Sequence, residues 1–431
     1  AVEAAGAGDP GWLVADRRAA FAAWQALPGE SNQLYTPYID LRAAQLAEAT
    51  FVPGATVEPG VASLDPGEDA VIETADDGSV RIALSAAARA AGVTVSPLRA
   101  AADDLRGRLD GGATLPDDDK FAQLTRALWA HGAAIDVPAG VRLERPIVVR
   151  WVVGTDGRAV VTRTLVHLGA GAEAAIVEEL TPVAAATGAT GATAQAFFAG
   201  TSELSLDAGA TLRMASLQEL PDHVVVIQHR RAEIGEDAIV QWAMAQLGGR
   251  LVRSRVDNRL VGDRSSVEQV EIVFGSDAQV FDLTSYTTHI GRDTTGDLLS
   301  KGALLESARA AFKGLITIDK TAVGTDSFLG EFGMNLSKQA RSVAIPSLEI
   351  DQPDCRRAMH SSSVGPVDEA QLFYLESRGI PRDEARKFIV LGFLEPVVAR
   401  VPLAAAQDHL RDLLEAKWAA GTDGVAGGAA A

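Results

Sequence analysis

One short turn recurs through the middle of the chain and limits the folds open to it. An apolar residue followed by glycine or acidic residues occurs as "LGAGA", "LDAGA", "IGEDA", "VGDRS", "FGSDA" and "IGRDT". These turns begin at residues 168, 206, 234, 261, 274 and 290, so their separations lie near multiples of about 13 to 14 residues. Short β-branched runs such as "VVVIQH" and "SSVEQVEIVFG" lie between them. The pattern is typical of a β-solenoid, in which each coil buries its inward residues against the neighbouring coils.

An antiparallel sandwich with irregular turns is the alternative fold, because it permits the same strand lengths. The spacing alone favours the solenoid only slightly. Changes in the pattern of helix-forming and strand-forming residues divide the chain into four parts. We expect a mostly helical region at 1–140, a β core at 141–350, a junction followed by helices at 351–418, and a disordered tail of small residues at 419–431.

Charge and hydrophobic content restrict the partners. The chain has 39 Lys and Arg against 57 Asp and Glu, a formal net charge of −18, and this acidity would repel nucleic acid and anionic lipid. No run approaches the roughly 18 apolar residues that a membrane-spanning helix needs. The opening "AVEAAGAGDPGW" is acidic where a signal peptide would be positive. We therefore expect a cytoplasmic protein that binds neither nucleic acid nor membrane.

Several short motifs are not interpreted as sites. "GLITIDKT" (314–321) resembles a phosphate loop, but Asp319 stands at the second glycine position, where a carboxylate would meet the phosphate. The serines at 361–363 have no nucleophile elbow around them. The chain's only cysteine, Cys355, can neither form an internal disulfide nor hold an iron–sulfur cluster, which usually takes four protein ligands. Any such cluster would have to be shared with another chain.

The stretch that contains Cys355 also contains His360. In an extended strand, residues two apart share a face, so residues five apart point to opposite faces. We therefore do not expect Cys355 to join His360. Cys355 is interpreted as a small, partly buried thiol and is at most a weak candidate ligand.

The C-terminal third resembles the SufB/SufD family of iron–sulfur cluster assembly scaffolds, and within it the SufD branch. The stretch "IPSLEIDQPDCRRAMHSSSVGPVDEAQLFYLESRGIPRDEARKFIVLGFLEPV" is similar to the family's closing signature. In that signature, Pro-x-Leu-Glu-Ile leads to Cys-x-His-Gly-Ala-Thr-Val-Gly and then to Leu-Phe-Tyr-Leu-x-Ser-Arg-Gly-Ile. Weaker similarity extends upstream through 289–316 and 121–147. The resemblance implies a right-handed parallel β-helix flanked by N-terminal and C-terminal helical regions, in agreement with the recurrent turns.

The resemblance also implies a function. It predicts a non-catalytic scaffold subunit that pairs with a SufB-type scaffold and docks a SufC-type ABC ATPase through its C-terminal helices. His360 corresponds to a histidine thought to complete a transient iron or iron–sulfur site shared with the partner's thiolate, so this chain alone would hold no cluster tightly. Five residues of the signature region are the expected docking residues: Leu372, Phe373, Tyr374, Arg378 and Phe393. Two departures are that Ala358 stands at the usual cysteine position and that serines at 361–363 replace Gly-Ala-Thr.

Two other functions remain possible on the sequence. A β-helix enzyme that acts on acidic polysaccharides would need charged residues on successive coils, and Asp282, His289 and Lys301 come nearest to that requirement. A homodimeric family member that pairs edge to edge and binds no cluster is the other alternative.

Overall fold

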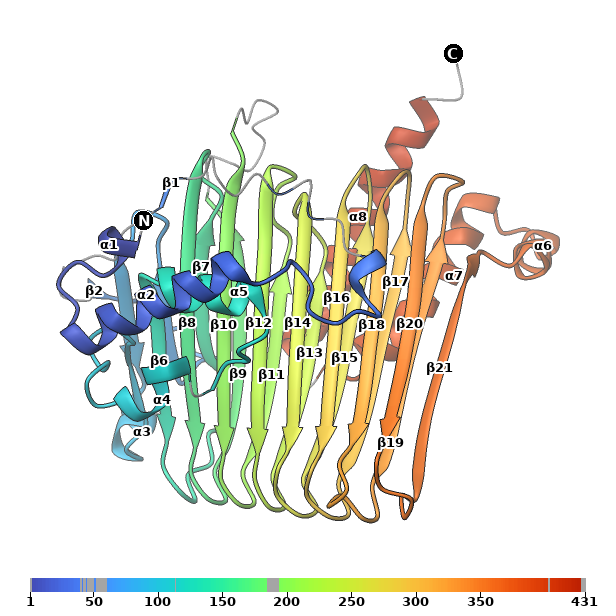
Figure 1. The fold of residues 1–431 in the computed structure, drawn as a ribbon. Coiled ribbons are helices and arrows are strands. Elements are labelled where there is room, and N and C mark those ends of the chain that lie inside the picture. Colours follow the sequence, from blue (N-terminus) through green and yellow to red (C-terminus); the bar gives the residue numbers. More distant parts are fainter. Residues whose placement is uncertain are drawn as a thin grey trace.

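The fold is a two-sheet solenoid with helical regions at both ends (Figure 1). The computed structural model describes residues 2–38, 41, 44, 50–51, 60–112, 114–183, 194–401 and 404–427. From residue 131 onward the chain passes alternately between two sheets, and from residue 158 onward each strand is parallel to the preceding strand of its own sheet. These parallel registers confirm the solenoid and exclude the antiparallel sandwich.

The first sheet comprises β1 (Thr50–Phe51), β5 (Thr94–Pro97), β6 (His131–Val137), β8 (Arg158–Leu168), β10 (Ala196–Leu206), β12 (Val224–Ile234), β14 (Leu251–Leu260), β16 (Val280–His289), β18 (Arg309–Ile318) and β20 (Arg341–Ile350). The second sheet comprises β2 (Gly60–Val61), β3 (Ala70–Thr74), β4 (Val80–Leu84), β7 (Ile147–Val153), β9 (Glu173–Pro182), β11 (Thr211–Gln218), β13 (Ile239–Gln246), β15 (Ser266–Gly275), β17 (Thr295–Leu304), β19 (Asp326–Asn335) and β21 (Arg357–Pro366). The helices are α1 (Val2–Ala5), α2 (Gly11–Ala26), η1 (Thr36–Tyr38), α3 (Ala86–Ala90), α4 (Arg106–Leu109), η2 (Asp110–Gly112), α5 (Lys120–Leu128), α6 (Glu369–Ser377), α7 (Arg382–Val398) and α8 (Ala404–Gly427).

The recurrent turns are the corners of the solenoid. In all six, the fourth residue has a positive φ, between 51° and 71°: Gly171, Gly209, Asp237, Arg264, Asp277 and Asp293. Five of them link a strand of the first sheet to the next strand of the second sheet, whereas "FGSDA" links β15 back to β16. The turns at 206, 234, 261 and 290 each mark one coil, so the sequence spacing of about 13 to 14 residues is half a coil.

Backbone hydrogen bonds join these corners as they join the strands. The N–H of Asp237 donates to the carbonyl of Asp263 over 2.9 Å, and the N–H of Arg264 donates to the carbonyl of Arg292 over 2.8 Å. Alternate strand residues fill the space between the sheets, where residues such as Val226, Leu283 and Phe312 belong to one continuous core. Successive coils are therefore held together both by hydrogen bonds at their corners and by apolar packing between the sheets.

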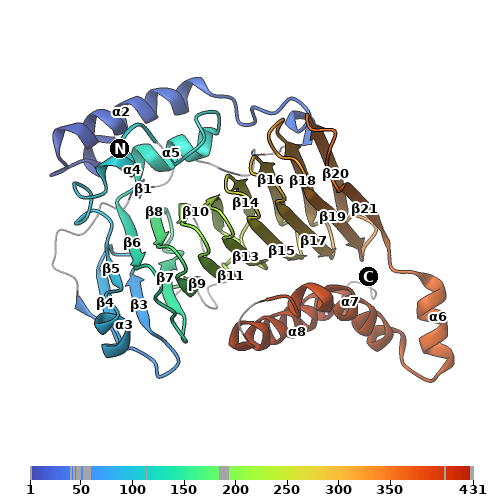
Figure 2. The same ribbon diagram turned by 90° about the horizontal axis from the view of Figure 1, so that it is seen from below.

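The N-terminal region covers the outer face of the first sheet. Figures 1 and 2 show α2 and α5 against this sheet, and the segment after α2 crosses it toward β18. The Tyr35 hydroxyl donates to the Gly314 carbonyl over 2.8 Å, and Glu30 Oε2 lies 3.4 Å from Lys313 Nζ. Residues 1–140 also contain strands β1 to β6, so this region is a mixture of helices and strands and not mostly helical.

The C-terminal helices cover the second sheet. Helices α7 and α8 pack on its outer face and bury an apolar cluster that includes Leu394, Leu410 and Trp418, while α6 projects beyond the last coil (Figure 2). Strand β21 lies after residue 350, so the solenoid includes part of the expected junction. Helix α8 extends to Gly427, past the point where the sequence suggested a tail. Residues 428–431 lie outside the described part of the chain.

Candidate functional site

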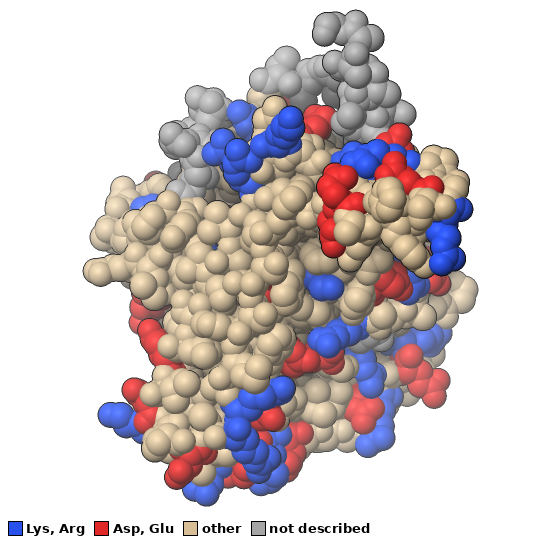
Figure 3. Space-filling view, turned by 90° about the vertical axis from the view of Figure 1, so that its right-hand side faces the viewer, with Lys and Arg blue, Asp and Glu red and all other residues tan. Residues whose placement is uncertain are grey.

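The solenoid ends in an exposed coil formed by β20 and β21, here called the open end. In the part of the chain that the structure describes, β20 pairs only with β18 and β21 only with β19. Apolar side chains are exposed there: Val343, Ile350, Met359 and Val364. Figure 3 views the molecule from this side and shows a broad area without charged side chains, with charged residues around it. An unpaired sheet edge with exposed apolar side chains is a surface on which another chain can pair.

His360 lies within the open end. It stands opposite Leu329 in the parallel pairing of β21 with β19. Leu329 is buried in a small core cluster with Leu298 and Ile316, so this row of the second sheet faces the solenoid interior. His360 continues the inward row but is exposed, because no further coil covers it. Its imidazole is therefore accessible to a group brought by a partner.

The sequence predicted that Cys355 and His360 would lie on opposite faces of one strand, but the structure places only His360 in a strand. Strand β21 begins at Arg357, so Cys355 lies in the preceding turn and the rule of alternating faces does not apply to it. The thiol is half-buried and packs against the same small core cluster as Leu348 and Ala358. Among the described residues, no group of three or more His, Cys, Asp or Glu side chains could hold a metal ion. A metal at His360 would need ligands from elsewhere.

Glu331 is a feature of the open end that the sequence analysis missed. It lies on β19 opposite Ser362 of β21, two positions after Leu329, and therefore faces the solenoid interior as Leu329 does. Its carboxylate accepts a hydrogen bond from the N–H of Ile345 over 3.0 Å. Burial raises the pKa of the Glu331 carboxyl from 4.5 to about 8, although that hydrogen bond opposes the rise. An acidic residue at an inward position of "DSFLGEFGMN" was the available signal.

Stability should therefore depend on the protonation of Glu331. The Glu331 carboxyl loses its proton near pH 4.5 in the unfolded chain and near pH 8 in the folded chain. The protonated carboxyl therefore contributes its full stabilisation of the fold below pH 4.5, and this stabilisation is lost as the pH rises to 8. The loss should be roughly 3 to 5 kcal/mol in the free energy of unfolding. Glu331→Gln keeps an acceptor for Ile345 without the charge, and should reduce this loss. Urea unfolding at pH 5 and pH 8 measures it, with the exposed Glu349→Gln as control. Equal pH dependence of Glu331→Gln and the wild type would contradict the assignment.

The expected docking residues divide into two groups. Phe373 is 72% exposed and Tyr374 is 55% exposed on α6, and the Arg378 guanidinium lies 5.0 Å from the Tyr374 ring centroid. Leu372, by contrast, is buried among the apolar residues of α7 and α8, so it supports the helices and is not available to a partner. Phe393 is partly buried against the same cluster.

Two neighbours complete this part of the surface. The Phe393 carbonyl accepts a hydrogen bond from Lys301 Nζ over 2.8 Å, which fixes α7 to the second sheet. Phe388 of α7, 59% exposed, adds an aromatic side chain that the sequence analysis did not single out. The surface offered by α6 and α7 is therefore made of Phe373, Tyr374 and Phe388 rather than Leu372.

The charged residues that came nearest to a polysaccharide-cleaving site do not converge. Asp282 is buried on the outer face of the first sheet beside Lys313. His289 points inward, where its ring nitrogens contact the hydroxyls of Thr294 and Ser327. Lys301 lies on the second sheet under α7. These side chains form no shared groove, so that alternative loses its supporting observation.

Comparison with known proteins adds an independent result. Residues 151–393 match the family model described as "SUF system FeS cluster assembly, SufBD core domain". This chain belongs to the SufBD family of iron–sulfur cluster assembly proteins. The match begins within β7 and covers the coils through β21, all of α6 and most of α7. The family resemblance seen in the sequence is thereby confirmed.

Several SufBD relatives can be compared over a large part of their length. The chain is 30% identical over 302 residues to the iron–sulfur cluster assembly protein SufD of Bacillus subtilis, covering 70% of this chain and 67% of that protein. It is 27% identical over 294 residues to a SufBD family protein of Staphylococcus epidermidis, covering 68% and 62%. A SufBD family protein of Mycobacterium tuberculosis is 31% identical over 225 residues, covering 51% and 57%. The chain is thus SufD-like and spans about two thirds of the first two relatives. Within the described residues, no helix is both long and apolar enough to cross a membrane.

Proposed function

We propose that this SufBD family chain is a non-catalytic scaffold subunit for iron–sulfur cluster assembly. It pairs through its open end with a scaffold of the SufB kind and carries an ATPase of the SufC kind on its C-terminal helices. The observation that carries the proposal is the open end itself: two free strand edges, exposed apolar side chains and an accessible histidine in one coil. The alternative that keeps the same surface is a homodimer that binds no cluster.

Pairing at the open end follows from the chemistry of strand edges. A free edge presents unpaired N–H and C=O groups, and a strand from a partner can satisfy them while covering the exposed apolar side chains. Pro346 lies within β20 and lacks an N–H, whereas the only proline of β21 is its last residue, Pro366. Strand β21 therefore offers the more complete set of backbone donors. A partner on β21 would also cover His360.

His360 would contribute a ligand to a cluster formed across this junction. A neutral imidazole can bind iron through one ring nitrogen, and thiolates are the softer ligands that iron–sulfur clusters require. Cys355 packs against the core and Ala358 has no ligating atom, so thiolates would have to come from the partner. The cluster is then transient cargo of the assembled complex.

The aromatic surface of α6 and α7 is the proposed site for the ATPase. Phe373, Tyr374 and Phe388 are large and exposed, and exposed aromatic side chains are common anchors in protein interfaces. The stretch that resembles a phosphate loop cannot supply the ATPase activity, because its residues 314–318 belong to strand β18. A separate ATPase subunit would therefore provide hydrolysis. The ATPase subunit could change the conformation of the scaffold only if it bound two scaffold conformations with different affinities.

Replacing His360 by alanine tests the cluster role. We expect the complex with SufB-type and SufC-type subunits to form normally and, after reconstitution, to retain several-fold less iron and sulfide than wild type. The physical reason is the loss of one ligand from an exposed position that contributes little to stability. The measurement is iron and sulfide content per complex of confirmed mass, with the exposed His409→Ala as a matched control. Unchanged iron and sulfide content in the His360 variant would show that His360 is not a cluster ligand and that this chain has only a structural role in the complex.

A further inference from the structure

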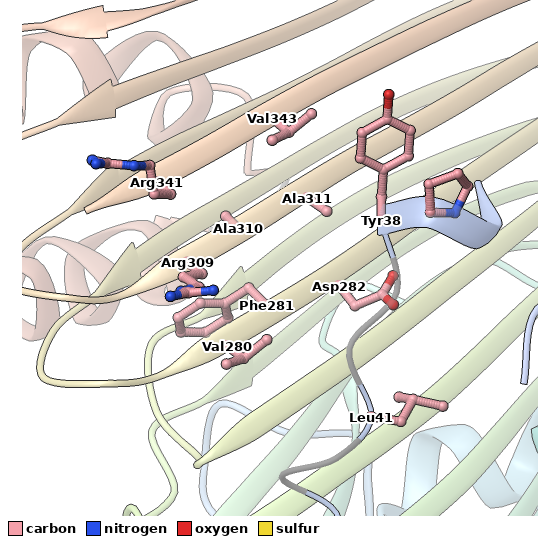
Figure 4. Close-up of a pocket in the computed structure, with 11 residues that line it drawn as sticks. Tyr38, Leu41, Val280, Phe281, Asp282, Arg309, Ala310, Ala311, Arg341 and Val343 are labelled. Atoms are coloured by element: carbon pink, nitrogen blue, oxygen red, sulfur yellow. The ribbon is translucent and has the colours of Figure 1, made fainter. Parts of the chain in front are cut away.

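A pocket lies on the outer face of the first sheet, beside the open end, and the proposed function assigns it no ligand. It has a volume of about 440 Å³ and lies between η1 and the strands β16, β18 and β20. In Figure 4, Arg309 and Arg341 stand at one end and Tyr38 at the other, with Ala310, Ala311 and Val343 between them. The volume is within the range typical of small-molecule sites.

Two arginines, Arg309 and Arg341, lie at one end of the pocket. Arg309 and Arg341 are direct partners in the pairing of β18 with β20. Neither guanidinium forms an ion pair with a carboxylate within the described residues, and the only carboxylate in the pocket lining is Asp282. Arg341 Nη1 donates to the carbonyls of Lys338 and Ala340, over 2.7 and 2.8 Å, and these bonds fix its position without removing its charge.

The one carboxylate in the pocket lining, that of Asp282, forms ion pairs with Lys313 and Arg253. Asp282 Oδ1 lies 2.6 Å from Lys313 Nζ, and its Oδ2 lies 3.3 Å from Arg253 Nη1. All three side chains are buried, so these contacts are little screened by water. Asp282 therefore does not offset the charge of Arg309 and Arg341.

A second cavity on the same sheet shows the opposite arrangement. It has a volume of about 470 Å³ and includes Arg231, Arg255 and Arg259 in its lining. Arg231 and Arg259 both contact Glu233, and Arg255 contacts Asp257. Because the arginines there have acidic partners, that cavity gives no reason to expect an anion. The pocket with Arg309 and Arg341 differs in this respect.

The rest of the pocket is apolar and partly open. Its floor includes the outward-facing side chains of Val280 and Ala311, while Val343 is 38% exposed. Tyr38 is 44% exposed and presents an aromatic ring at the far side. A ligand that lies between the arginines and Tyr38 would bury apolar surface on this floor. The site is thus cationic at one end and apolar along its length.

We propose that this pocket binds a small organic anion with a flat, apolar body. The anionic group, a carboxylate or a phosphate, lies between Arg309 and Arg341, because guanidinium groups match both anions with paired hydrogen bonds. The ring-bearing body covers Ala311 and Val343 and reaches Tyr38. The pocket shares Arg341 and Val343 of β20 with the open end, but His360 lies on the other sheet, so binding to the chain alone does not depend on cluster assembly.

Titration calorimetry of the full chain tests the site with three probes: 2-naphthoate, 2-naphthyl phosphate and inorganic phosphate. We expect one of the naphthyl probes to bind with one-to-one stoichiometry, and the stronger of the two to identify the preferred anionic group. Inorganic phosphate should bind at least tenfold more weakly, because it leaves the apolar floor uncovered. Equal binding of inorganic phosphate and naphthyl phosphate would overturn the organic part of the proposal.

Two variants locate the binding. The double substitution Arg309→Gln and Arg341→Gln should weaken binding of the naphthyl probe at least tenfold, whereas Arg292→Gln, an exposed arginine in a distant turn, should not change it. Ala311→Phe fills the floor without changing the charge and should also weaken binding. Urea unfolding of each variant shows that it remains folded. No saturable binding of either naphthyl probe, or equal affinity in the double variant, would overturn the proposal.

Discussion

Replacing Gly262 by alanine should destabilise the solenoid severely, although the change adds only one methyl group. Gly262 is the second residue of the turn "VGDRS", and a Cβ atom placed there would lie 2.0 Å from the backbone nitrogen of Glu236 and 2.2 Å from the carbonyl carbon of Gly235. The obstructing atoms are backbone of the neighbouring coil, so no side-chain rotation can relieve the clash. Two coils would have to separate at this corner. Because packed cores tolerate little displacement, we expect a loss of about 4 kcal/mol or more in the free energy of unfolding.

Chemical denaturation followed by far-ultraviolet circular dichroism measures this loss. Gly107→Ala is the matched control, since a Cβ at Gly107 meets no atom within 4 Å and its backbone is not in the left-handed region. That variant should be as stable as the wild type or slightly more stable, because alanine is the better helix former. If Gly262→Ala and Gly107→Ala had the same stability, the close stacking of the corners would be wrong.

Adding positive charge to both free edges should abolish pairing with the SufB-type scaffold while leaving the fold intact. Ile350 ends β20 and is 45% exposed, and Met359 lies on β21 and is 50% exposed. In the double variant Ile350→Lys and Met359→Lys, a partner strand would have to bury two ammonium groups. Lysine is a residue with which natural proteins protect sheet edges from pairing. We expect at least a hundredfold weaker association.

The matched control carries the same charges away from the open end. Ile239 and Val261 are 39% and 38% exposed, and both lie at corners of inner coils. The double variant Ile239→Lys and Val261→Lys should pair like the wild type in a co-purification assay or in sedimentation velocity. Full association of the edge variant, or equal loss in both variants, would show that the open end is not the pairing surface.

The recurrent turns and the family resemblance together predicted the solenoid, although the turns alone favoured it only slightly over the sandwich. Every recurrent turn places its fourth residue at positive φ, and glycine and aspartate are among the residues that adopt this conformation most readily. The family signature also located His360. That residue remains a candidate ligand, because its placement in the open end agrees with the role but does not test it.

Other features could not be predicted because they depend on contacts between distant segments. Leu372 and Phe373 are neighbours in one apolar run, yet only the packing of α6 against α7 and α8 decides that the first is buried and the second exposed. Glu331 looks like any acidic strand residue until the register with β21 shows that it faces inward. Arg309 and Arg341 are 32 positions apart, and only the stacking of β18 on β20 brings them together.

The mass of the complex that this chain forms when it is co-expressed with SufB-type and SufC-type subunits tests the central claim most directly. The proposed function predicts a stable assembly that contains all three kinds of subunit, with this chain contributing its open end and its α6 and α7 surface. Light scattering on the purified material gives the mass, and denaturing electrophoresis gives the composition. Recovery of this chain only as a monomer or a homodimer, with the other subunits present but unbound, would contradict the account.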